Sequence, residues 1–254
     1  MATCQTCHDP LVLSLNDSDS EEAQTQPIPD DLLLPCGCHF HWQCLLDQSP
    51  TISLSLTCPS CSTYLPTNAA GPSATNQFLP TTQSNPIPAV YNSEGGTSEL
   101  DILPILTEEA FLSSHPEARP ARAMHTMAAE GDISGIVSLL ADIDGDDDVD
   151  TSAVELLRWT DPLNGGKTAL HVAVEQGQEE VFWLVLWLGS AVATELFPEA
   201  VVQSANEFGM GRRKEVPVGE DARFIVDGMG RSPAEVMVEK GGPWRRYVEG
   251  GLFS

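Results

Sequence analysis

The stretch "LPCGCHFHWQCLL", Leu34 to Leu46, places three cysteines and two histidines within nine positions. Thiolate and imidazole groups are the side chains that most often bind structural zinc. Further cysteines flank this stretch. The candidate ligands form four pairs: Cys4 and Cys7, Cys36 and Cys38, His41 and Cys44, and Cys58 and Cys61. Eight donors suit two tetrahedral zinc ions with four ligands each, so the sequence predicts two structural zinc sites.

The number and position of the cysteines favour metal binding over disulfide bonds. All seven cysteines of the 254-residue chain lie in its first 61 residues. An odd number fits a disulfide framework poorly, and the polar start "MATCQTCHDP" does not resemble a signal segment. We therefore expect a reducing compartment, either cytoplasmic or nuclear.

The charge of the chain narrows its possible partners. The formal net charge is −25, and residues 1–118 contain 14 Asp and Glu but no Lys or Arg. Phosphate binding needs clustered basic residues, so we expect no nucleic-acid partner, and a basic protein surface is the more natural partner. The uncharged run from Val181 to Ala193 is too short to span a bilayer, so we expect a buried helix there and no membrane partner.

Composition divides the chain into three parts. Residues 1–65 hold every cysteine, and we expect them to form a small zinc-stapled finger. Residues 66–118 are rich in Ser, Thr, Asn, Gln and Pro, which predicts a flexible, disordered acidic linker. Helical periodicity returns from about Leu100 onward, and we expect residues 119–254 to form an all-α domain with the main core.

The cysteine-rich part resembles a RING finger. Its centre, Cys36-Gly-Cys-His-Phe-His-Trp-Gln-Cys44, follows the family pattern Cys-Gly-His-x-Phe-His-x-x-Cys, except that Cys38 stands where histidine is usual. His39 is an alternative ligand to Cys38, although the motif favours Cys38. The resemblance implies an α+β cross-brace fold with two ligand sets: Cys4, Cys7, His41 and Cys44 for one ion, and Cys36, Cys38, Cys58 and Cys61 for the other.

The resemblance also implies a function, because RING fingers typically act as ubiquitin ligases. They dock a ubiquitin-charged conjugating enzyme and position its thioester, without forming a covalent intermediate themselves. Pro59 matches a proline of the family's docking groove, and Leu45 and Leu46 are candidates for its apolar surface. For the two leucines the alternative is packing of a short helix.

Three positions depart from the docking pattern of the family. Thr6 stands where an apolar residue is common, Gln48 where tryptophan is frequent, and Ser62 where many active members have Arg or Lys. These departures favour an alternative function, that of a non-catalytic zinc-binding adaptor or scaffold for protein–protein interaction.

The C-terminal part carries a second resemblance. The segment "GKTALHVAVEQGQEEVFWLVLWLGS", Gly166 to Ser190, resembles an ankyrin repeat, and poorer copies begin at Arg122 and Ser232. About three repeats are therefore expected, centred on residues 122–141, 164–190 and 228–250, in a stack interrupted by insertions. Ankyrin repeats bind proteins, so the resemblance implies recruitment of a protein substrate. It also implies that His171 stabilises a turn by hydrogen bonds.

Overall fold

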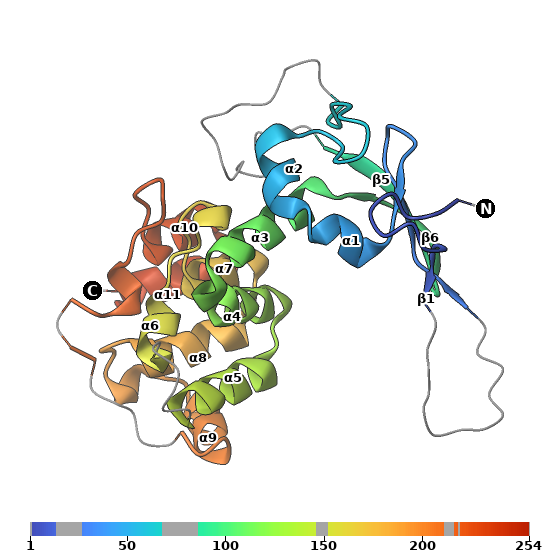
Figure 1. Ribbon diagram of the computed structural model, residues 1–254. Coiled ribbons are helices and arrows are strands. Elements are labelled where there is room, and N and C mark those ends of the chain that lie inside the picture. The colour runs from blue at the N-terminus through green and yellow to red at the C-terminus, as the bar shows by residue number, and fades with distance from the viewer. Residues whose placement is uncertain are drawn as a thin grey trace, which may run out of the picture. The chain divides into compact units, whose positions relative to one another are not determined.

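The computed structural model describes residues 2–13, 27–67, 86–145, 152–210, 216–217 and 219–253 (Figure 1). The chain divides into two compact units, Met1–Pro116 and Glu117–Ser254. A small β-sheet and the cysteine-rich clusters lie in the first unit, whereas the second is mostly helical.

The first unit contains a short two-stranded sheet and a four-stranded sheet, both antiparallel. The two-stranded sheet joins β1 (Val12–Leu13) to β2 (Ile28–Pro29). The other has the order β4-β3-β5-β6, formed by β3 (Asp31–Leu33), β4 (His39–Phe40), β5 (Pro88–Ser93) and β6 (Gly96–Asp101). Leu32 of the inner strand β3 is buried and pairs with Phe40 on one side and Tyr91 on the other.

The described residues of the first unit also form three helices: α1 (Trp42–Leu46), α2 (Ser49–Ser55) and α3 (Leu103–Ser114). Helix α2 has Pro50 in its first turn, where a missing N–H costs no hydrogen bond. It ends at Leu56, which adopts the left-handed conformation. Helix α3 packs against α2. The core between the helices and the sheet includes Phe40, Leu45, Ile52, Ile87 and Leu106, each at most 1% exposed.

The linker predicted for residues 66–118 is wrong for residues 86–116, which form β5, β6 and α3 and belong to the first unit. Ile87 and Ala89 are buried on either side of the exposed Pro88, which is the alternation of a half-buried strand. The Tyr91 hydroxyl donates to Asp30 Oδ1 at 3.0 Å, and its ring centroid lies 4.9 Å from that of Trp42. Residues 68–85 lie outside the described residues, and the other proposed boundaries stay a prediction.

The second unit contains eight α-helices within its described residues, connected by turns and short 3₁₀ helices. They are α4 (Arg119–Glu130), α5 (Ile133–Gly145), α6 (Ala153–Arg158), α7 (Ala169–Gln176), α8 (Glu179–Gly189), α9 (Glu199–Glu207), α10 (Pro233–Lys240) and α11 (Arg245–Glu249). Gly131 ends α4 and Gly177 ends α7, each with φ of 83°, a conformation that glycine adopts without a Cβ penalty. The pairs α4–α5 and α7–α8 are thus joined by similar turns.

Helix α7 packs against α4 and against α10. The loops that precede α7 and α10 meet where the Gly228 N–H donates to the Gly165 carbonyl at 2.7 Å. A Cβ on Gly166 would lie 2.8 Å from the Gly228 nitrogen, so this approach needs glycine. His171 Nδ1 accepts the Thr168 N–H, which leaves Nε2–H to donate to the Arg231 carbonyl at 3.0 Å. The hydrogen-bonding role predicted for His171 is confirmed.

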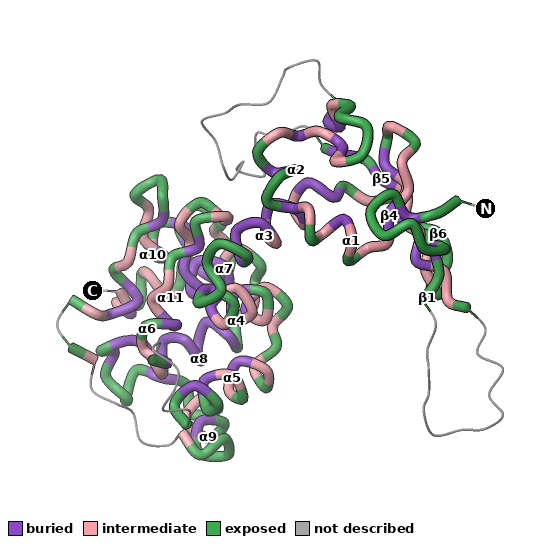
Figure 2. Tube along the Cα trace, viewed as in Figure 1, coloured by how far each residue is buried: buried purple, intermediate pink, exposed green. Residues whose placement is uncertain are grey.

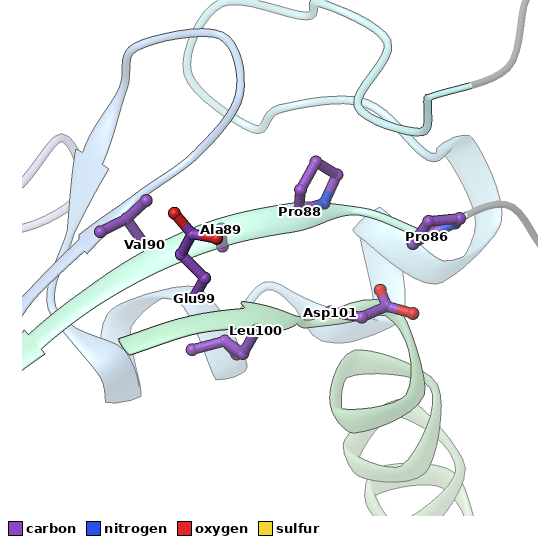
Figure 3. A pocket seen from close by; sticks show the side chains of 7 residues that line it. All are labelled: Pro86, Pro88, Ala89, Val90, Glu99, Leu100 and Asp101. Atoms are coloured by element: carbon purple, nitrogen blue, oxygen red, sulfur yellow. The ribbon is translucent and has the colours of Figure 1, made fainter. Parts of the chain in front are cut away.

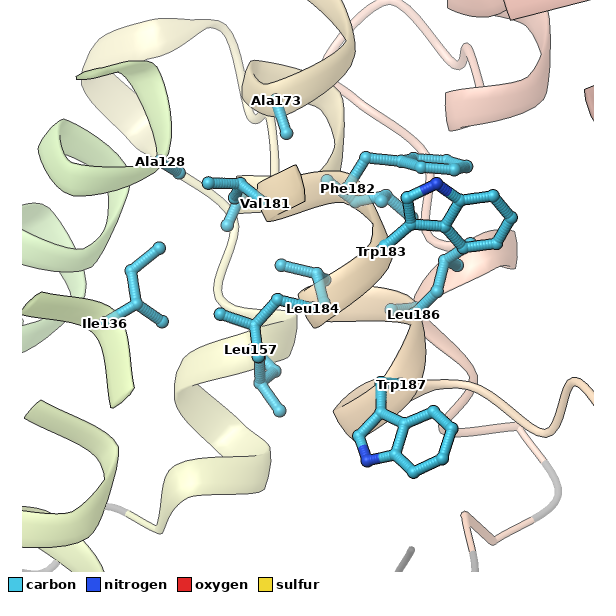
Figure 4. Close-up of a cluster of buried hydrophobic side chains, with 14 of the residues drawn as sticks. Ala128, Ile136, Leu157, Ala173, Val181, Phe182, Trp183, Leu184, Leu186 and Trp187 are labelled. Atoms are coloured by element: carbon cyan, nitrogen blue, oxygen red, sulfur yellow. The ribbon is translucent and has the colours of Figure 1, made fainter. Parts of the chain in front are cut away.

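Helix α8 supplies much of the core of the second unit, and Figure 2 shows it buried along most of its length. Trp183 and Trp187 are 7% and 2% exposed, and Figure 4 shows them among the other apolar side chains of this core. The indole N–H of Trp187 donates to the Met210 carbonyl at 2.9 Å, which satisfies its buried polar group. Within the described residues, no helix combines the length and the apolar character needed to cross a membrane.

Candidate metal centre

The first ligand cluster joins a loop at the start of the chain to helix α1. Thr3 and Pro10 form an isolated bridge that closes the loop carrying Cys4 and Cys7. This loop is tied to β4 by a hydrogen bond from the Gln5 N–H to the His39 carbonyl, 2.9 Å long. His41, just before α1, and Cys44, within α1, complete the cluster. The ligand atoms of Cys4, Cys7, His41 and Cys44 all lie within 4.8 Å of one another.

The distances in this cluster are those that one zinc ion requires. His41 Nδ1 lies 3.3 Å from Cys7 Sγ and 3.8 Å from Cys44 Sγ. In a tetrahedron with ordinary zinc–sulfur and zinc–nitrogen bonds, a sulfur and a nitrogen ligand are about 3.5 Å apart. His41 Nε2 donates to the Pro10 carbonyl at 2.9 Å. This bond turns the lone pair of Nδ1 toward the sulfur atoms, as in many zinc sites.

The second cluster joins the turn between β3 and β4 to the turn after α2. Cys36 and Cys38 flank Gly37, whose φ of 85° reverses the chain so that both thiols reach the same side. The turn that carries Cys58 and Cys61 is closed by a bridge between Thr57 and Tyr64. The sulfur atoms of the four cysteines, Cys36, Cys38, Cys58 and Cys61, lie within 4.8 Å of one another.

The thiols of the two clusters differ in how readily they ionise. Burial and the neighbouring thiols raise the pKa of Cys36 in the second cluster and of Cys44 in the first to about 12. Burial opposes ionisation of Cys4 as well, but hydrogen bonds from the backbone at Cys7 and His41 lower its pKa to about 6. Ionisation of all the thiols of one cluster is therefore unfavourable without a positive ion to balance them. The donor set fits zinc, and each cluster could hold one zinc ion.

The structure distinguishes between Cys38 and His39 as the fourth ligand of the RING pattern. Cys38 belongs to the second cluster, whereas His39 Nδ1 donates to Asp31 Oδ1 at 2.7 Å on the neighbouring strand. Of these two residues, only Cys38 therefore lies with the other three cysteines, and His39 has its partner outside the cluster. The exchange of histidine for cysteine in the motif therefore keeps four donors in the cluster.

The three residues predicted to dock a partner differ in exposure. Leu45 is 1% exposed and belongs to the core, so its prediction as docking surface is wrong and the alternative, helix packing, applies. Leu46 and Pro59 are half-buried, and their role in docking stays a prediction.

A buried aspartate, Asp30, forms hydrogen bonds with two segments next to the clusters, and the sequence alone did not identify it. Its side chain is 3% exposed, and Oδ1 accepts hydrogen bonds from the Trp42 N–H at 3.1 Å and the Tyr91 hydroxyl at 3.0 Å. It thus connects the start of α1 with β5. Its bonding partners lie 12 and 61 residues away, so no local spacing signal could have revealed this role.

The comparisons with known proteins returned no match. No model of a protein family matches the chain, and no curated protein or solved structure does so either.

Two neighbouring histidines provide a direct test of the ligand assignment. Replacing His41 with alanine removes a donor from the first cluster, and we expect the variant to bind one zinc ion tightly instead of two. Replacing His39 with alanine removes only its bond to Asp31, so both ions should remain. Native mass spectrometry counts the ions. Loss of zinc from the His39 variant, with two ions retained in the His41 variant, would contradict the assignment.

Proposed function

We propose that this chain is a RING-type ubiquitin ligase. The observation that carries the proposal is the order of the ligands. The first and third pairs along the chain form one cluster, and the second and fourth pairs form the other. This interleaved order is the cross-brace of RING fingers, and it supports the resemblance of the Cys36–Cys44 stretch to that family.

In the proposed function the chain acts by positioning. A conjugating enzyme, carrying ubiquitin as a thioester, docks on the first unit. The substrate lysine amine then attacks the thioester carbon, so that an isopeptide bond forms and the enzyme's thiol leaves. Bound zinc would fix the two loops that frame the docking surface. Leu46 at the end of α1 and Pro59 in the turn between Cys58 and Cys61 are half-buried, so part of each side chain is available to a partner.

The helical unit is proposed to recruit the substrate as an ankyrin-like stack. Three features support this assignment: the similar turns at Gly131 and Gly177, the packing of α7 against both α4 and α10, and the bond from His171 to the Arg231 carbonyl. Each repeat of such a stack buries its apolar face against its neighbours and leaves the loops for protein binding.

The proposed activity is tested by discharge of ubiquitin from a panel of charged conjugating enzymes to free lysine. The full chain should accelerate discharge from at least one of them. We expect Pro59→Ala to slow this reaction while two zinc ions remain bound, because the substitution removes only surface at the docking site. Ser62→Arg should accelerate it, because a basic residue can hydrogen-bond both ubiquitin and the enzyme.

The adaptor function is the second candidate, and it is favoured by the polar residues at the docking positions. Thr6 and Ser62 are exposed, and neither supplies the apolar or basic side chain that active RING fingers use. If the zinc-loaded chain accelerates discharge from no enzyme of the panel, and Ser62→Arg does not restore activity, the adaptor function replaces the ligase.

A further inference from the structure

Strand β6 lies at one edge of the four-stranded sheet. β6 (Gly96–Asp101) is the last strand in the order β4-β3-β5-β6, so within the described residues no strand pairs with its far side. Five of its six residues are exposed, and Leu100 is half-buried. Natural sheets usually protect such an edge with Lys, Pro or a bulge, because free N–H and C=O groups can pair with another chain. The segment Gly-Thr-Ser-Glu-Leu-Asp of β6 has neither Lys nor Pro.

The two faces of β6 have different chemistry. Leu100 packs against the core of the first unit, whereas Thr97 and Glu99 point to the opposite face. A hollow of about 480 Å³ lies along β5 and β6, with apolar side chains and acidic groups in its wall (Figure 3). The lining residues are Pro86, Pro88, Ala89, Val90, Glu99, Leu100 and Asp101. An added strand would thus meet the apolar side chain of Leu100 on one face and the carboxylate of Glu99 on the other.

Charge specifies the partner further. Residues 1–118 contain 14 Asp and Glu and no Lys or Arg, so an approaching cationic chain meets no basic side chain of this unit. The Asp101 carboxylate already accepts the backbone N–H groups of Ile87 and Leu103, at 2.9 and 3.1 Å. Glu99 is therefore the carboxylate of the strand that is best placed to meet a basic side chain.

We propose that the β6 edge binds an extended segment of a partner protein in which basic and apolar residues alternate, and that this segment pairs with β6 as a fifth strand of the sheet. Backbone hydrogen bonds provide the general affinity in such strand addition, and the alternating side chains provide selectivity. Basic residues would face Glu99, and apolar residues would lie on the face of Leu100.

A second copy of this chain is a poor occupant of the same edge. Pairing two β6 strands would bring Glu99 and Asp101 of both copies together without any Lys or Arg from this unit to compensate. Like charges opposite one another across strands are destabilising. The proposal concerns binding alone and does not depend on ligase activity.

The test is a fluorescence anisotropy titration of the zinc-loaded full chain against a short, labelled, capped peptide that alternates lysine and valine. The unmodified chain should bind this peptide. Glu99→Lys should weaken binding roughly tenfold at physiological salt, because it replaces an attraction with a repulsion. A peptide of the same sequence with alternate backbone nitrogens methylated should lose binding when the methyl groups face β6, because these nitrogens can no longer donate to the strand edge.

The matched control is Glu94→Lys, which makes the same charge change in the turn between β5 and β6. Ser93 pairs with Gly96, so position 94 lies in the turn beyond Gly96, and Gly96 is three residues, or about 10 Å, along the strand from position 99. This separation exceeds the Debye length of about 8 Å at physiological salt, so binding should change by about twofold or less. Two results would show attraction by net charge alone and overturn the proposal. One is equal weakening of binding by both substitutions, and the other is full binding by both methylated peptides, whichever edge of the peptide carries the methyl groups. Sedimentation showing a dimer that Glu99→Lys dissociates would identify a second copy as the occupant and also overturn it.

Discussion

Replacing Cys58 with serine will reduce the bound zinc from two ions to one and will unfold much of the N-terminal unit. Cys58 is 1% exposed and its sulfur belongs to the second cluster, which joins the turn between β3 and β4 to the turn after α2. A serine hydroxyl does not ionise near neutral pH and is a poor zinc ligand. A structural zinc ion contributes about 10–16 kcal/mol to folding, which exceeds the stability of most small domains. Native mass spectrometry measures the zinc, and hydrogen exchange of residues 27–67 measures the unfolding.

The control for this prediction is Ser60→Ala, in the same turn between Cys58 and Cys61. Ser60 is exposed, and its hydroxyl donates to Gln5 Oε1 at 3.2 Å, a bond worth about 1 kcal/mol or less at the surface. This variant should bind two zinc ions and keep the exchange pattern of the unmodified chain. A Cys58→Ser chain that retains two ions and normal protection would show that the second cluster is not a structural zinc site.

The metal clusters could be predicted from the sequence because ligand spacing is a local property. Cys4 and Cys7, or Cys58 and Cys61, can reach one ion only when the intervening turn has the right length, and this length is visible in the sequence. The choice between Cys38 and His39 was less certain, because adjacent residues satisfy almost the same spacing. It depends on which side chain turns toward the other cysteines, and His39 instead forms a hydrogen bond with Asp31 on the neighbouring strand β3.

The strands β5 and β6 were missed because their stability depends on distant partners. Residues 86–101 contain few large apolar side chains, so their composition resembles that of a linker. Strand preference depends strongly on the neighbouring strand. Here β5 pairs with β3, which lies some 55 residues earlier, and the Tyr91 hydroxyl completes the hydrogen bonds of the buried Asp30. No periodicity within residues 86–101 reveals these contacts.

The helical unit was easier to predict where helices follow the local pattern. Gly177 and the apolar run of α8 are visible in the sequence, and the expected buried helix spans Glu179–Gly189. The segments that connect the helix pairs were harder to predict from the sequence. Helix α6 and helix α9 fall in the insertions between the expected repeats, and α9 has only one buried residue, Ala205. Helix α9 has 9 residues, which is shorter than the window of roughly 11–18 residues over which helical periodicity is recognised.

Replacing Phe182 with alanine will destabilise the C-terminal unit by about 3–5 kcal/mol, which is a large part of the stability of a typical domain. Phe182 is fully buried in α8. Its ring centroid lies 5.1 Å from that of Trp183, 5.2 Å from that of Trp244 and 5.3 Å from that of Tyr247. Alanine would leave a cavity among rigid aromatic rings that cannot collapse to fill it. Urea unfolding followed by circular dichroism measures the loss.

The matched control is Phe224→Ala, the same substitution at a site where the side chain is 58% exposed. Its ring stacks on the guanidinium of Arg223, with 4.9 Å from Cζ to the ring centroid, and buries little apolar area. We expect the free energy of unfolding to fall by about 1 kcal/mol or less, because the substitution removes little buried apolar area and leaves no cavity. Equal losses in the two variants would mean that Phe182 does not occupy a packed core. The stack of helices around α8 would then have to be arranged differently, because its aromatic cluster joins α8 to the segment that ends in α11.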